Sequence, residues 1–421
     1  MRHRPSPLLL ALAALLGGLL FCGILSGRPE MFIAAIPAFV ALLSAARPVD
    51  PATVDIAVEP SATQVIEGDR LWVTVTLRSR RPVPTLELLL PLPPSVMSES
   101  GETWLVTRLV PTQPSTHRFA LRAIVRDRAR LGPIHLRTTD SSGLFVAETT
   151  IGGVELSIYP RMSRLRSLPR PNRTRTALGN YISPTLGEGL EPGEIRPFAP
   201  GDQVRQINWP VSLRLGQLHV TRFHQERNAD VVLLLDTLAS AGAPPYSTMD
   251  ASVRAATALA GAYLMRKDRV GLVEYGGYLR WTKPASGRRH LSGLIEAVLP
   301  AEVVFTYVAK DLATVPATAL PARSLIIAIS PLIDERFGRA MLDLVGRGHD
   351  LLLLAVSPIA ATRRALAPSQ RNDLACRLWA LEWHDQVGAW RGRGIPVVEW
   401  NPDTPLEEAL AALPPSRRGR R

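Results

Sequence analysis

Cysteine, lysine and aromatic residues are scarce in this chain of 421 residues. The two cysteines, Cys22 and Cys376, cannot form a disulfide framework, which fits a reducing compartment. Only Lys267, Lys283 and Lys310 are lysines, so the formal net charge of +12 comes almost wholly from arginine, as is typical of a GC-rich bacterial genome. Because no known motif and no pattern of stacking aromatic residues accompanies the arginines, we expect no nucleic-acid partner.

Catalytic signatures are also missing from the sequence. The chain contains no P-loop, no nucleophile elbow, no paired-histidine zinc helix and no Cys-x-x-Cys pair. The histidines His224, His290 and His349 are isolated from one another in the sequence. We therefore expect a protein that is not an enzyme, with a hydrolase of unrecognised site as an alternative.

Two apolar runs occupy the first 47 residues. The first, Leu8 to Leu25, is uncharged, and its eighteen residues would rise about 27 Å as a helix, enough to cross a hydrocarbon core. The second, Met31 to Ala46, is shorter and contains Pro37. The sequence thus predicts a transmembrane helical hairpin over residues 1–47.

Basic residues flank this pair of apolar runs. Arg2 and Arg4 precede the first run and Arg47 follows the second, whereas the connecting loop carries one Arg and one Glu. The positive-inside rule places both ends in the cytoplasm and predicts a multi-pass protein of the plasma membrane with cytoplasmic soluble domains. A cleaved signal peptide, with Arg2 and Arg4 as its basic start, is the alternative.

Residues 50–160 show the pattern of short β-strands. Val54, Ile56 and Val58 alternate with polar residues, and the stretch from Leu71 to Leu77 repeats this period of two. Regular short strands separated by Pro and Gly predict an antiparallel β-sandwich-like domain. Since this region has no catalytic constellation, we expect a spacer or an interaction module.

Residues 161–229 form an Arg-rich crossing segment towards the next domain. The arginine run in its first part, up to Arg175, is expected to be a solvated linker, and a lipid- or partner-facing strip is the alternative. Its first part contains Arg161, Arg164, Arg166, Arg170, Arg173 and Arg175.

The stretch from Glu194 to Arg227 interleaves charged, aromatic and turn residues too regularly for a linker. An acidic residue, Arg, an aromatic, Pro-Gly-Asp, Arg, Ile and Trp follow one another, an order that resembles the signature of the domain of unknown function 58 (DUF58) family. The matching residues are Glu194, Arg196, Phe198, Pro200, Gly201, Asp202, Arg205, Ile207, Asn208 and Trp209. Relatives in that family are often associated with MoxR-type AAA+ ATPases, so the resemblance implies such an ATPase as partner.

The chemistry of this signature permits two interpretations. In the first, the Pro-Gly-Asp element forms a tight turn, and Arg196 and Arg205 clamp Asp202 or Glu194. Trp209 then anchors the loop against the next sheet, so that the signature is a structural lock. In the second, the signature is a recognition surface for a partner protein, since Arg and Trp dominate interface hot spots. The residues concerned are Glu194, Arg196, Gly201, Asp202, Arg205, Asn208 and Trp209.

Residues 230–412 alternate apolar strands with helical segments. This alternation predicts a parallel sheet with helices on both faces. The order of elements resembles the von Willebrand factor type A fold, a Rossmann-like α/β architecture that accompanies the signature in the family. Residues 413–421 follow as a short basic tail, expected to be disordered. Strands are expected at residues 231–235, 269–275, 325–330, 351–356 and 396–400, and helices at 251–265, 289–298, 335–346 and about 373–390.

Complete members of that fold carry a metal-ion-dependent adhesion site, so the resemblance implies oxygen ligands for Mg²⁺ after the first and fourth strands. The chain keeps Asp236 and Ser240 of the Asp-x-Ser-x-Ser motif, but Leu238 occupies the first Ser position. Pro331 stands where the family often has Asp, so this ligand is missing or is supplied by Asp334. We expect a degenerate metal site of Asp236, Ser240 and Asp334. The alternative is a vestigial site in which Asp236 bonds neighbouring backbone amides.

Together these features predict a multidomain, membrane-anchored and non-enzymatic adaptor. It would bind a partner protein through the von Willebrand type A-like domain and the signature, and would work with the ATPase in protein maturation or complex assembly. A structural or adhesion protein in cell-envelope assembly is the alternative, and it requires the soluble part to lie outside the membrane.

Overall fold

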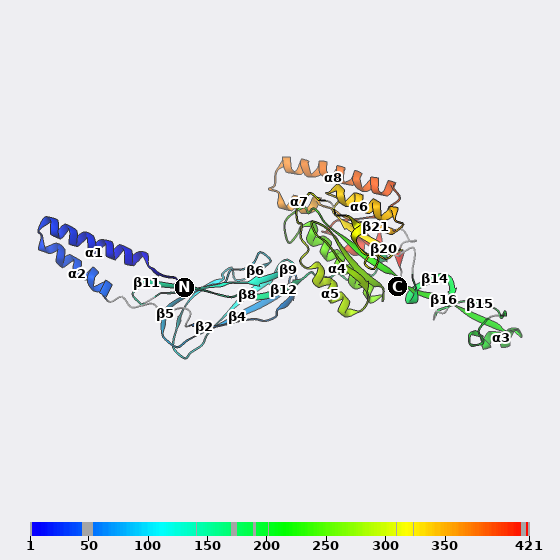
Figure 1. Ribbon diagram of the computed structural model, residues 1–421, viewed down its shortest axis with the longest axis horizontal. Helices are drawn as coiled ribbons and strands as arrows, with labels where there is room; N and C mark the ends of the chain where they lie inside the picture. The colour runs from blue at the N-terminus through cyan, green and yellow to red at the C-terminus, as the bar shows by residue number, and fades with distance from the viewer. Residues whose placement is uncertain are drawn as a thin grey trace. The chain divides into compact units, whose positions relative to one another are not determined.

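The computed structural model describes residues 2–43, 54–139, 141–169, 175–187, 191–200, 202–308, 310–322, 324–413 and 418–419. The chain divides into two compact units, Met1–Tyr159 and Pro160–Arg421. The chain is therefore multidomain, with apolar helices at its N-terminus and several β-sheets, as predicted (Figure 1).

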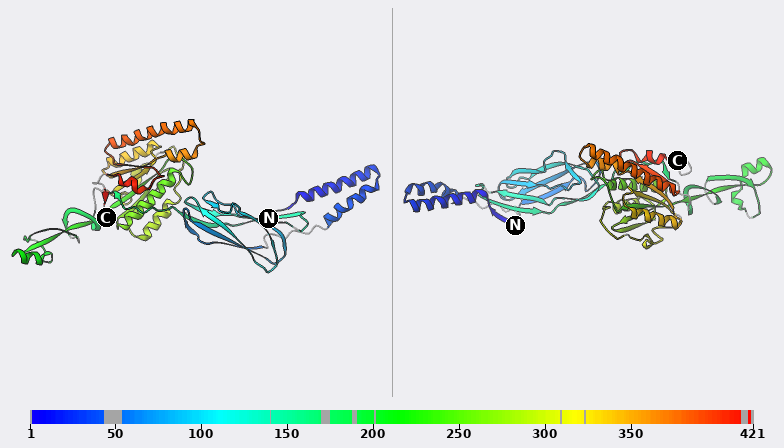
Figure 2. Two further views of the ribbon diagram at one scale, coloured as in Figure 1. Left: turned by 180° about the vertical axis from the view of Figure 1, so that it is seen from behind. Right: turned by 90° about the horizontal axis from the view of Figure 1, so that it is seen from above.

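Two apolar helices occupy the start of the first unit. Helix α1 (Pro7–Ser26) begins at Ser6, whose Oγ accepts a hydrogen bond from the Leu9 amide at 3.2 Å, and it ends at Gly27 in the left-handed conformation. Helix α2 (Pro29–Leu43) lies beside α1 in both figures (Figures 1 and 2). The predicted second run extended to Ala46, but residues 44–53, including Arg47, lie outside the described residues.

The apolar character of α1 agrees with the predicted first span. With 20 residues it is long and apolar enough to cross a membrane, by length and composition only, whereas α2 with 15 residues is shorter. Inside α1, the position of a Cβ on Gly23 would lie 3.0 Å from the ring of Phe32, so the missing side chain allows the two helices to touch.

β-Sheets form the rest of the first unit, and their described pairings are antiparallel except the parallel one between residues 64–66 and 157–159. Their strands alternate between buried and exposed side chains because period-two sequences place one face of each strand in the core. The sheet orders are β1-β11-β10-β5-β7, β2-β4-β8-β6 and β3-β12-β9. The strands are β1 (Arg2–Pro5), β2 (Val54–Pro60), β3 (Gln64–Ile66), β4 (Arg70–Ser79), β5 (Val83–Leu89), β6 (Val96–Ser98), β7 (Trp104–Leu109), β8 (Ser115–Ala123), β9 (Asp127–Leu131), β10 (Ile134–Thr139), β11 (Phe145–Ile151) and β12 (Val154–Tyr159).

A three-stranded sheet carries the signature and begins at the end of the arginine run. Strands β14 (Arg175–Gly187), β16 (His219–Asn228) and β15 (Glu191–Pro197) pair in that order, and helix α3 (Trp209–Leu215) and a 3-10 turn (Val204–Gln206) connect β15 to β16. All pairings are antiparallel and contain irregular registers. Of the arginine run expected to be a solvated linker, Arg175 begins β14, whereas Arg170 and Arg173 lie outside the described residues.

A six-stranded sheet is the centre of the second unit. Its order is β19-β18-β17-β20-β21-β22, and every pairing is parallel except that of β18 with β19. Strand β17 is buried along its whole length because both faces of the sheet are covered. The strands are β17 (Asp230–Thr237), β18 (Arg269–Gly276), β19 (Leu279–Ala285), β20 (Leu325–Ser330), β21 (Asp350–Val356) and β22 (Val397–Trp400).

Helices cover this sheet on two sides, each with its own core. One core contains side chains of α4, α5 and α9, and the other contains side chains of α6 and α8. Alternate residues of β17 serve the two cores, with Leu233 in the first and Leu234 in the second. The helices are α4 (Thr248–Met265), α5 (Arg288–Val298), α6 (Glu335–Gly346), α7 (Ile359–Ala365), α8 (Gln370–Gly392) and α9 (Leu406–Ala411).

The start and end of the second unit also pair. Strand β13 (Leu168–Pro169) is antiparallel to β23 (Arg418–Gly419). This pairing differs from the disorder expected for the whole basic tail, of which residues 414–417, 420 and 421 lie outside the described residues.

Candidate functional site

Asp236 lies at the carboxyl edge of the six-stranded sheet, the side at which its parallel strands end. Its Oδ1 accepts a hydrogen bond from the Leu238 amide at 3.0 Å, and its Oδ2 accepts one from Ser330 Oγ at 2.5 Å. The side chain is fully buried, and this burial raises the pKa of the Asp236 carboxyl to about 7, although both hydrogen bonds oppose the rise. The expected amide contact of Asp236 is thus present.

Asp334 lies on the same edge and is paired with Arg336. Asp334 caps helix α6 by accepting a hydrogen bond from the Arg336 amide at 2.9 Å. The guanidinium of Arg336 returns to the same carboxylate, with Nη2 to Oδ2 at 2.6 Å and Nε to Oδ1 at 2.9 Å. This hydrogen-bonded pair lowers the pKa of Asp334 and keeps it ionised.

Ser240, the third expected metal ligand, faces a different set of partners. Its Oγ shares a hydrogen bond with Thr248 Oγ1 at 3.1 Å and accepts one from the Met249 amide at 3.2 Å. It therefore secures the start of α4. Asp236 and Asp334 interact electrostatically, since the Asp334 charge contributes to the raised pKa of Asp236, but Ser240 does not share their hydrogen bonds.

Metal-ligating side chains do not gather elsewhere in the described ranges. Within residues 2–43, 54–139 and the later described segments, no group of three or more His, Cys, Asp or Glu side chains could hold a metal ion. Leu238, at the first Ser position of the motif, is buried in the core beside β17.

The backbone after β20 is strained next to this edge. Leu332 adopts a φ of +58°, a conformation that bulky residues rarely take. Its amide donates to Ser330 Oγ at 2.9 Å, and its side chain is buried in the second core. The strained residue therefore orients the Ser330 hydroxyl that donates to Asp236.

Arg336 and Ser330 were missed from the sequence. An Arg in the first turn of a helix could have indicated a nearby acidic partner, because the positive N-terminal end of the macrodipole disfavours an unpaired cation there. Such a residue implies a compensating acid, which here is Asp334.

An exposed loop adjoins the pair of Asp334 and Arg336. Residues 303–308, called the aromatic loop below, contain Phe305 and Tyr307, which are 74% and 89% exposed. The two rings meet edge to face with centroids 4.8 Å apart. Arg336 Nη1 donates a hydrogen bond to the Thr306 carbonyl and thereby tethers the loop to the sheet edge.

The signature forms the far end of the three-stranded sheet, and we call residues 195–221 the signature tip. Arg196 Nη2 pairs with Asp202 Oδ1 at 2.6 Å, and the Ala199 amide donates to Asp202 Oδ2 at 2.8 Å. Asn208 begins helix α3 by accepting a hydrogen bond from the Val211 amide at 3.2 Å. The expected clamp of Asp202 is therefore present, with Arg196 as its cation.

Other signature residues do not occupy the positions that the structural-lock interpretation predicts. Trp209 is 57% exposed, so its expected role as an anchor against a sheet was wrong. Arg205 Nε donates to Gln203 Oε1 at 2.6 Å. Gly201 and the side chain of Glu194 lie outside the described residues.

Apolar side chains cover the signature tip. They come from β15, the 3-10 turn, α3 and the residue just before β16, and none of them is buried. They are Ile195, Val204, Trp209, Leu213, Leu215 and Leu218.

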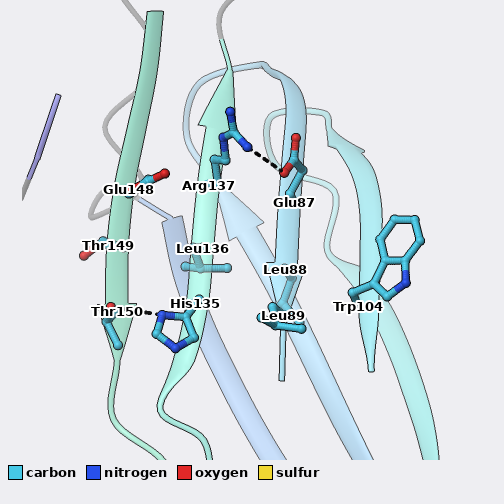
Figure 3. A pocket seen from close by; sticks show the side chains of 10 residues that line it. All are labelled: Glu87, Leu88, Leu89, Trp104, His135, Leu136, Arg137, Glu148, Thr149 and Thr150. Carbon is cyan, nitrogen blue, oxygen red and sulfur yellow. Dashed lines mark hydrogen bonds and ion pairs between the residues drawn. The ribbon is translucent and has the colours of Figure 1, made fainter. Parts of the chain in front are cut away.

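A pocket lies on the outer face of the first unit, over strands β11, β10, β5 and β7 (Figure 3). Trp104 stands at one side of it and is 55% exposed. Arg137 and Glu87 form an ion pair of 3.6 Å along its wall, and the pair of Thr150 and His135 is hydrogen-bonded at 3.4 Å (Figure 3). The pocket therefore combines one aromatic face with paired polar groups.

The comparisons with known proteins agree with the signature. The family model described as "Protein of unknown function DUF58" matches residues 194–362. This match confirms the resemblance to the DUF58 family over the tip, β17 to β21 and the helices between them.

Two relatives show the extent of the likeness. "Uncharacterized protein YeaD" of Bacillus subtilis (strain 168) is 26% identical over 185 residues, which are 42% of this chain and 46% of that protein. "Uncharacterized protein Rv1480" of Mycobacterium tuberculosis is 27% identical over 265 residues, 57% of this chain and 83% of that protein. The chain thus spans about half the length of the first relative.

Solved structures resemble parts of the chain only weakly. The cupredoxin domain of amoB from Nitrosocaldus yellowstonii has a TM-score of 0.19 at 15% identity and covers 25% of this chain and 86% of its own. Native alpha-2-macroglobulin from Escherichia coli has a TM-score of 0.20 at 18% identity, covering 35% of this chain and 20% of its own. These scores are too low to indicate a shared fold.

Proposed function

We propose that the protein is a membrane-anchored, non-enzymatic adaptor that binds a partner protein through the signature tip and a von Willebrand type A-like domain. The observation that carries the proposal is the exposed apolar surface of the signature tip. A monomer gains nothing by leaving Trp209 and Leu213 in water, since each could contribute about 1.5–3 kcal/mol if it were buried.

The construction of the tip supports recognition by a protein. The pair of Arg196 and Asp202 and the cap by Asn208 hold α3 in place, so its apolar side chains are presented by a fixed helix. Aromatic and Arg side chains on rigid elements are the usual anchors of interfaces because little conformational entropy is lost on binding.

The charge of the tip indicates the chemistry of the partner. Residues 195–221 contain three arginines against one aspartate, and that aspartate is already paired. An apolar groove bordered by acidic residues would complement Trp209 and the exposed Arg214. Following the family resemblance, we propose a MoxR-type AAA+ ATPase as this partner and protein maturation or complex assembly as the process.

The six-stranded sheet supports the von Willebrand type A-like assignment. Numbered along the chain within this sheet, its strands lie in the order 3-2-1-4-5-6, and strand 3 is the antiparallel one. Helices on both faces give the layers of a Rossmann-like domain, and binding sites in such sheets lie at the carboxyl edge.

The N-terminal strand supports a membrane hairpin. Strand β1 pairs with β11 in a register that joins Arg2 to Glu148 and Pro5 to Phe145. Residues before α1 and residues of the sandwich-like domain must therefore lie on the same side of any membrane that α1 crosses. An even number of crossings satisfies this condition, so we propose that α2 returns the chain to the cytoplasmic side although it has only 15 residues.

The test is affinity purification of the detergent-solubilised protein from its native host, followed by mass spectrometry. Two substitutions are compared, Trp209→Ala at the tip and Trp104→Ala in the first unit, where a tryptophan of nearly equal exposure serves as control. We expect a MoxR-type ATPase to be enriched with the wild type and the control and to be lost with Trp209→Ala. Enrichment that survives Trp209→Ala but not Trp104→Ala would reject the tip as the interface.

The pocket beside Trp104 favours a second candidate, a structural or adhesion protein in cell-envelope assembly. An exposed aromatic face among hydrogen-bonding groups is suited to a polar ligand, and that ligand would lie in the envelope. The candidate requires the soluble units outside the membrane. Labelling of a Tyr307→Cys variant by a membrane-impermeant thiol reagent in intact cells would support it, whereas labelling only after lysis would support the adaptor.

A further inference from the structure

We propose that Arg336 occupies the functional place of a divalent cation at the carboxyl edge of the six-stranded sheet, so that this edge is organised without metal. The inference deepens the proposed function, because it rests on the von Willebrand type A-like assignment for the expectation of a cation. It is carried by the hydrogen bonds of Asp236, Asp334 and Arg336.

The residues at this edge do not fit Mg²⁺. A hard cation of this kind requires about six oxygen ligands in octahedral geometry. Leu238 and Pro331 bring no side-chain oxygen, and Ser240 is hydrogen-bonded to Thr248 and the Met249 amide. The two oxygens of Asp236 already accept from the Leu238 amide and Ser330 Oγ.

The guanidinium instead satisfies the groups that a cation would satisfy. Arg336 neutralises Asp334 through both carboxylate oxygens, and it interacts electrostatically with the buried Asp236. Its planar fork is permanently charged and donates hydrogen bonds to both oxygens of the carboxylate. The positive charge needed at this edge is therefore part of the chain.

The same guanidinium extends the site to the surface. Its Nη1 donates to the Thr306 carbonyl in the aromatic loop, between the exposed rings of Phe305 and Tyr307. A close approach at the neighbouring turn supports the loop, since a Cβ on Gly277 would lie 2.5 Å from the Val304 carbonyl oxygen. Arg336 thus links the half-buried Asp334 carboxylate to a surface that a partner protein can contact.

The test measures cation binding on the full-length protein, purified in detergent and freed of metal with a chelator. Thermal unfolding is followed by tryptophan fluorescence, with and without millimolar Mg²⁺ or Mn²⁺. Arg336→Met is compared with Arg339→Met, which removes an arginine of the same helix that pairs with the exposed Glu335 at 3.5 Å.

We expect the melting temperature of the wild type and of Arg339→Met to be independent of either cation. Arg336→Met should melt at a lower temperature and should recover by about 2–4 °C with Mg²⁺ or Mn²⁺, because a cation can then approach the Asp334 carboxylate that has lost its guanidinium. A cation-dependent rise in the wild type that Asp236→Asn abolishes would overturn the proposal, as would an Arg336→Met variant that no cation stabilises.

Arg336→Lys keeps the positive charge but lacks the planar guanidinium. It therefore tests the hydrogen bond from residue 336 to the Thr306 carbonyl, even if Arg336→Met does not fold. We expect chymotrypsin to cleave this variant after Phe305 or Tyr307 several-fold faster than the wild type or Arg339→Met. Equal cleavage rates would refute the tethering role. None of these measurements involves a partner, so their failure is distinct from failure of the proposed adaptor function.

Discussion

Replacement of Asp236 by Asn should change how the stability of the α/β unit depends on pH. In the folded protein burial raises the pKa of Asp236 to about 7, from an ordinary value of 3.8. Between these two values the native state holds a proton that the unfolded chain releases. The contribution of Asp236 to stability is therefore highest at low pH, falls as the pH rises through this window, and levels off above pH 7.

The size of the effect follows from the two pKa values. A single such group changes the free energy of unfolding by about 1.4 kcal/mol per pH unit inside the window. Between pH 5 and pH 8 the Asp236 carboxyl should thus cost the folded wild type about 2–3 kcal/mol. Asn cannot ionise, while its amide keeps an oxygen for the Leu238 amide and a nitrogen that can donate to Ser330 Oγ.

The assay is urea-induced unfolding of both full-length chains in detergent at pH 5 and at pH 8. Titrating groups that do not interact with Asp236, such as His349, whose pKa burial lowers, contribute equally to both chains and cancel in the difference. The buried Trp383 provides a local fluorescence signal, because its indole N–H donates to the Pro331 carbonyl at 3.0 Å.

Two outcomes would refute this reasoning. Equal pH dependence of the two chains would mean that Asp236 stays ionised at pH 5 in spite of its burial. A wild type that gains stability relative to Asp236→Asn as the pH rises would mean that its charge is compensated in the native state. Ser330→Ala provides an independent check, since loss of the hydroxyl donor should move the fall in stability to higher pH.

Three further predictions concern local contacts. Arg196→Ala leaves the nearly buried Asp202 without its cation, and should cost about 1–3 kcal/mol and speed amide exchange in the tip, as measured by mass spectrometry. Asn208→Ala removes the cap of α3 and should cost about 1 kcal/mol, measured in the same way; unchanged exchange would contradict the cap. Gly277→Ala should lower the melting temperature by forcing the aromatic loop away, whereas Gly346→Ala, with open space around it, should not; equal melting temperatures would contradict the close approach.

The central strands of the α/β unit were predictable because strands buried on both faces have uninterrupted apolar sequences. β17, β20 and β21 are continuous apolar runs, and the predicted ranges differ from the observed ones by two residues at most. The edge strand β19 was missed because one of its sides has no neighbour, so polar residues such as Lys283 interrupt its pattern.

The three-stranded sheet of the signature could not be predicted from local pattern. Its strands contain Gly, Pro and Arg, and their pairing partners are distant, as between Arg175 and Asn228. β1 has the same character, since it pairs with β11 across more than one hundred residues. Such pairings depend on tertiary contacts that propensity does not encode.

The candidate site was half predictable for a similar reason. Asp236 follows a buried strand and is found by its position, whereas Arg336 acts through a side chain that folds back on Asp334. The sequence also suggested a Trp209 anchor, because a large aromatic is more often buried than exposed. Only the structure shows that more than half of the Trp209 side chain is exposed.

The two candidate surfaces differ in charge, and this difference separates their contributions to binding. At the carboxyl edge, Asp334 and Arg336 neutralise each other and Asp236 is buried, so the aromatic loop presents an uncharged apolar surface. The signature tip instead carries an excess of arginine among its apolar side chains. Attraction of an acidic partner therefore belongs to the tip and should weaken as salt screens it, whereas contacts through Phe305 and Tyr307 should persist at high salt. If the partner dissociates from the wild type at high salt and already dissociates from Trp209→Ala at low salt, the signature tip alone binds it.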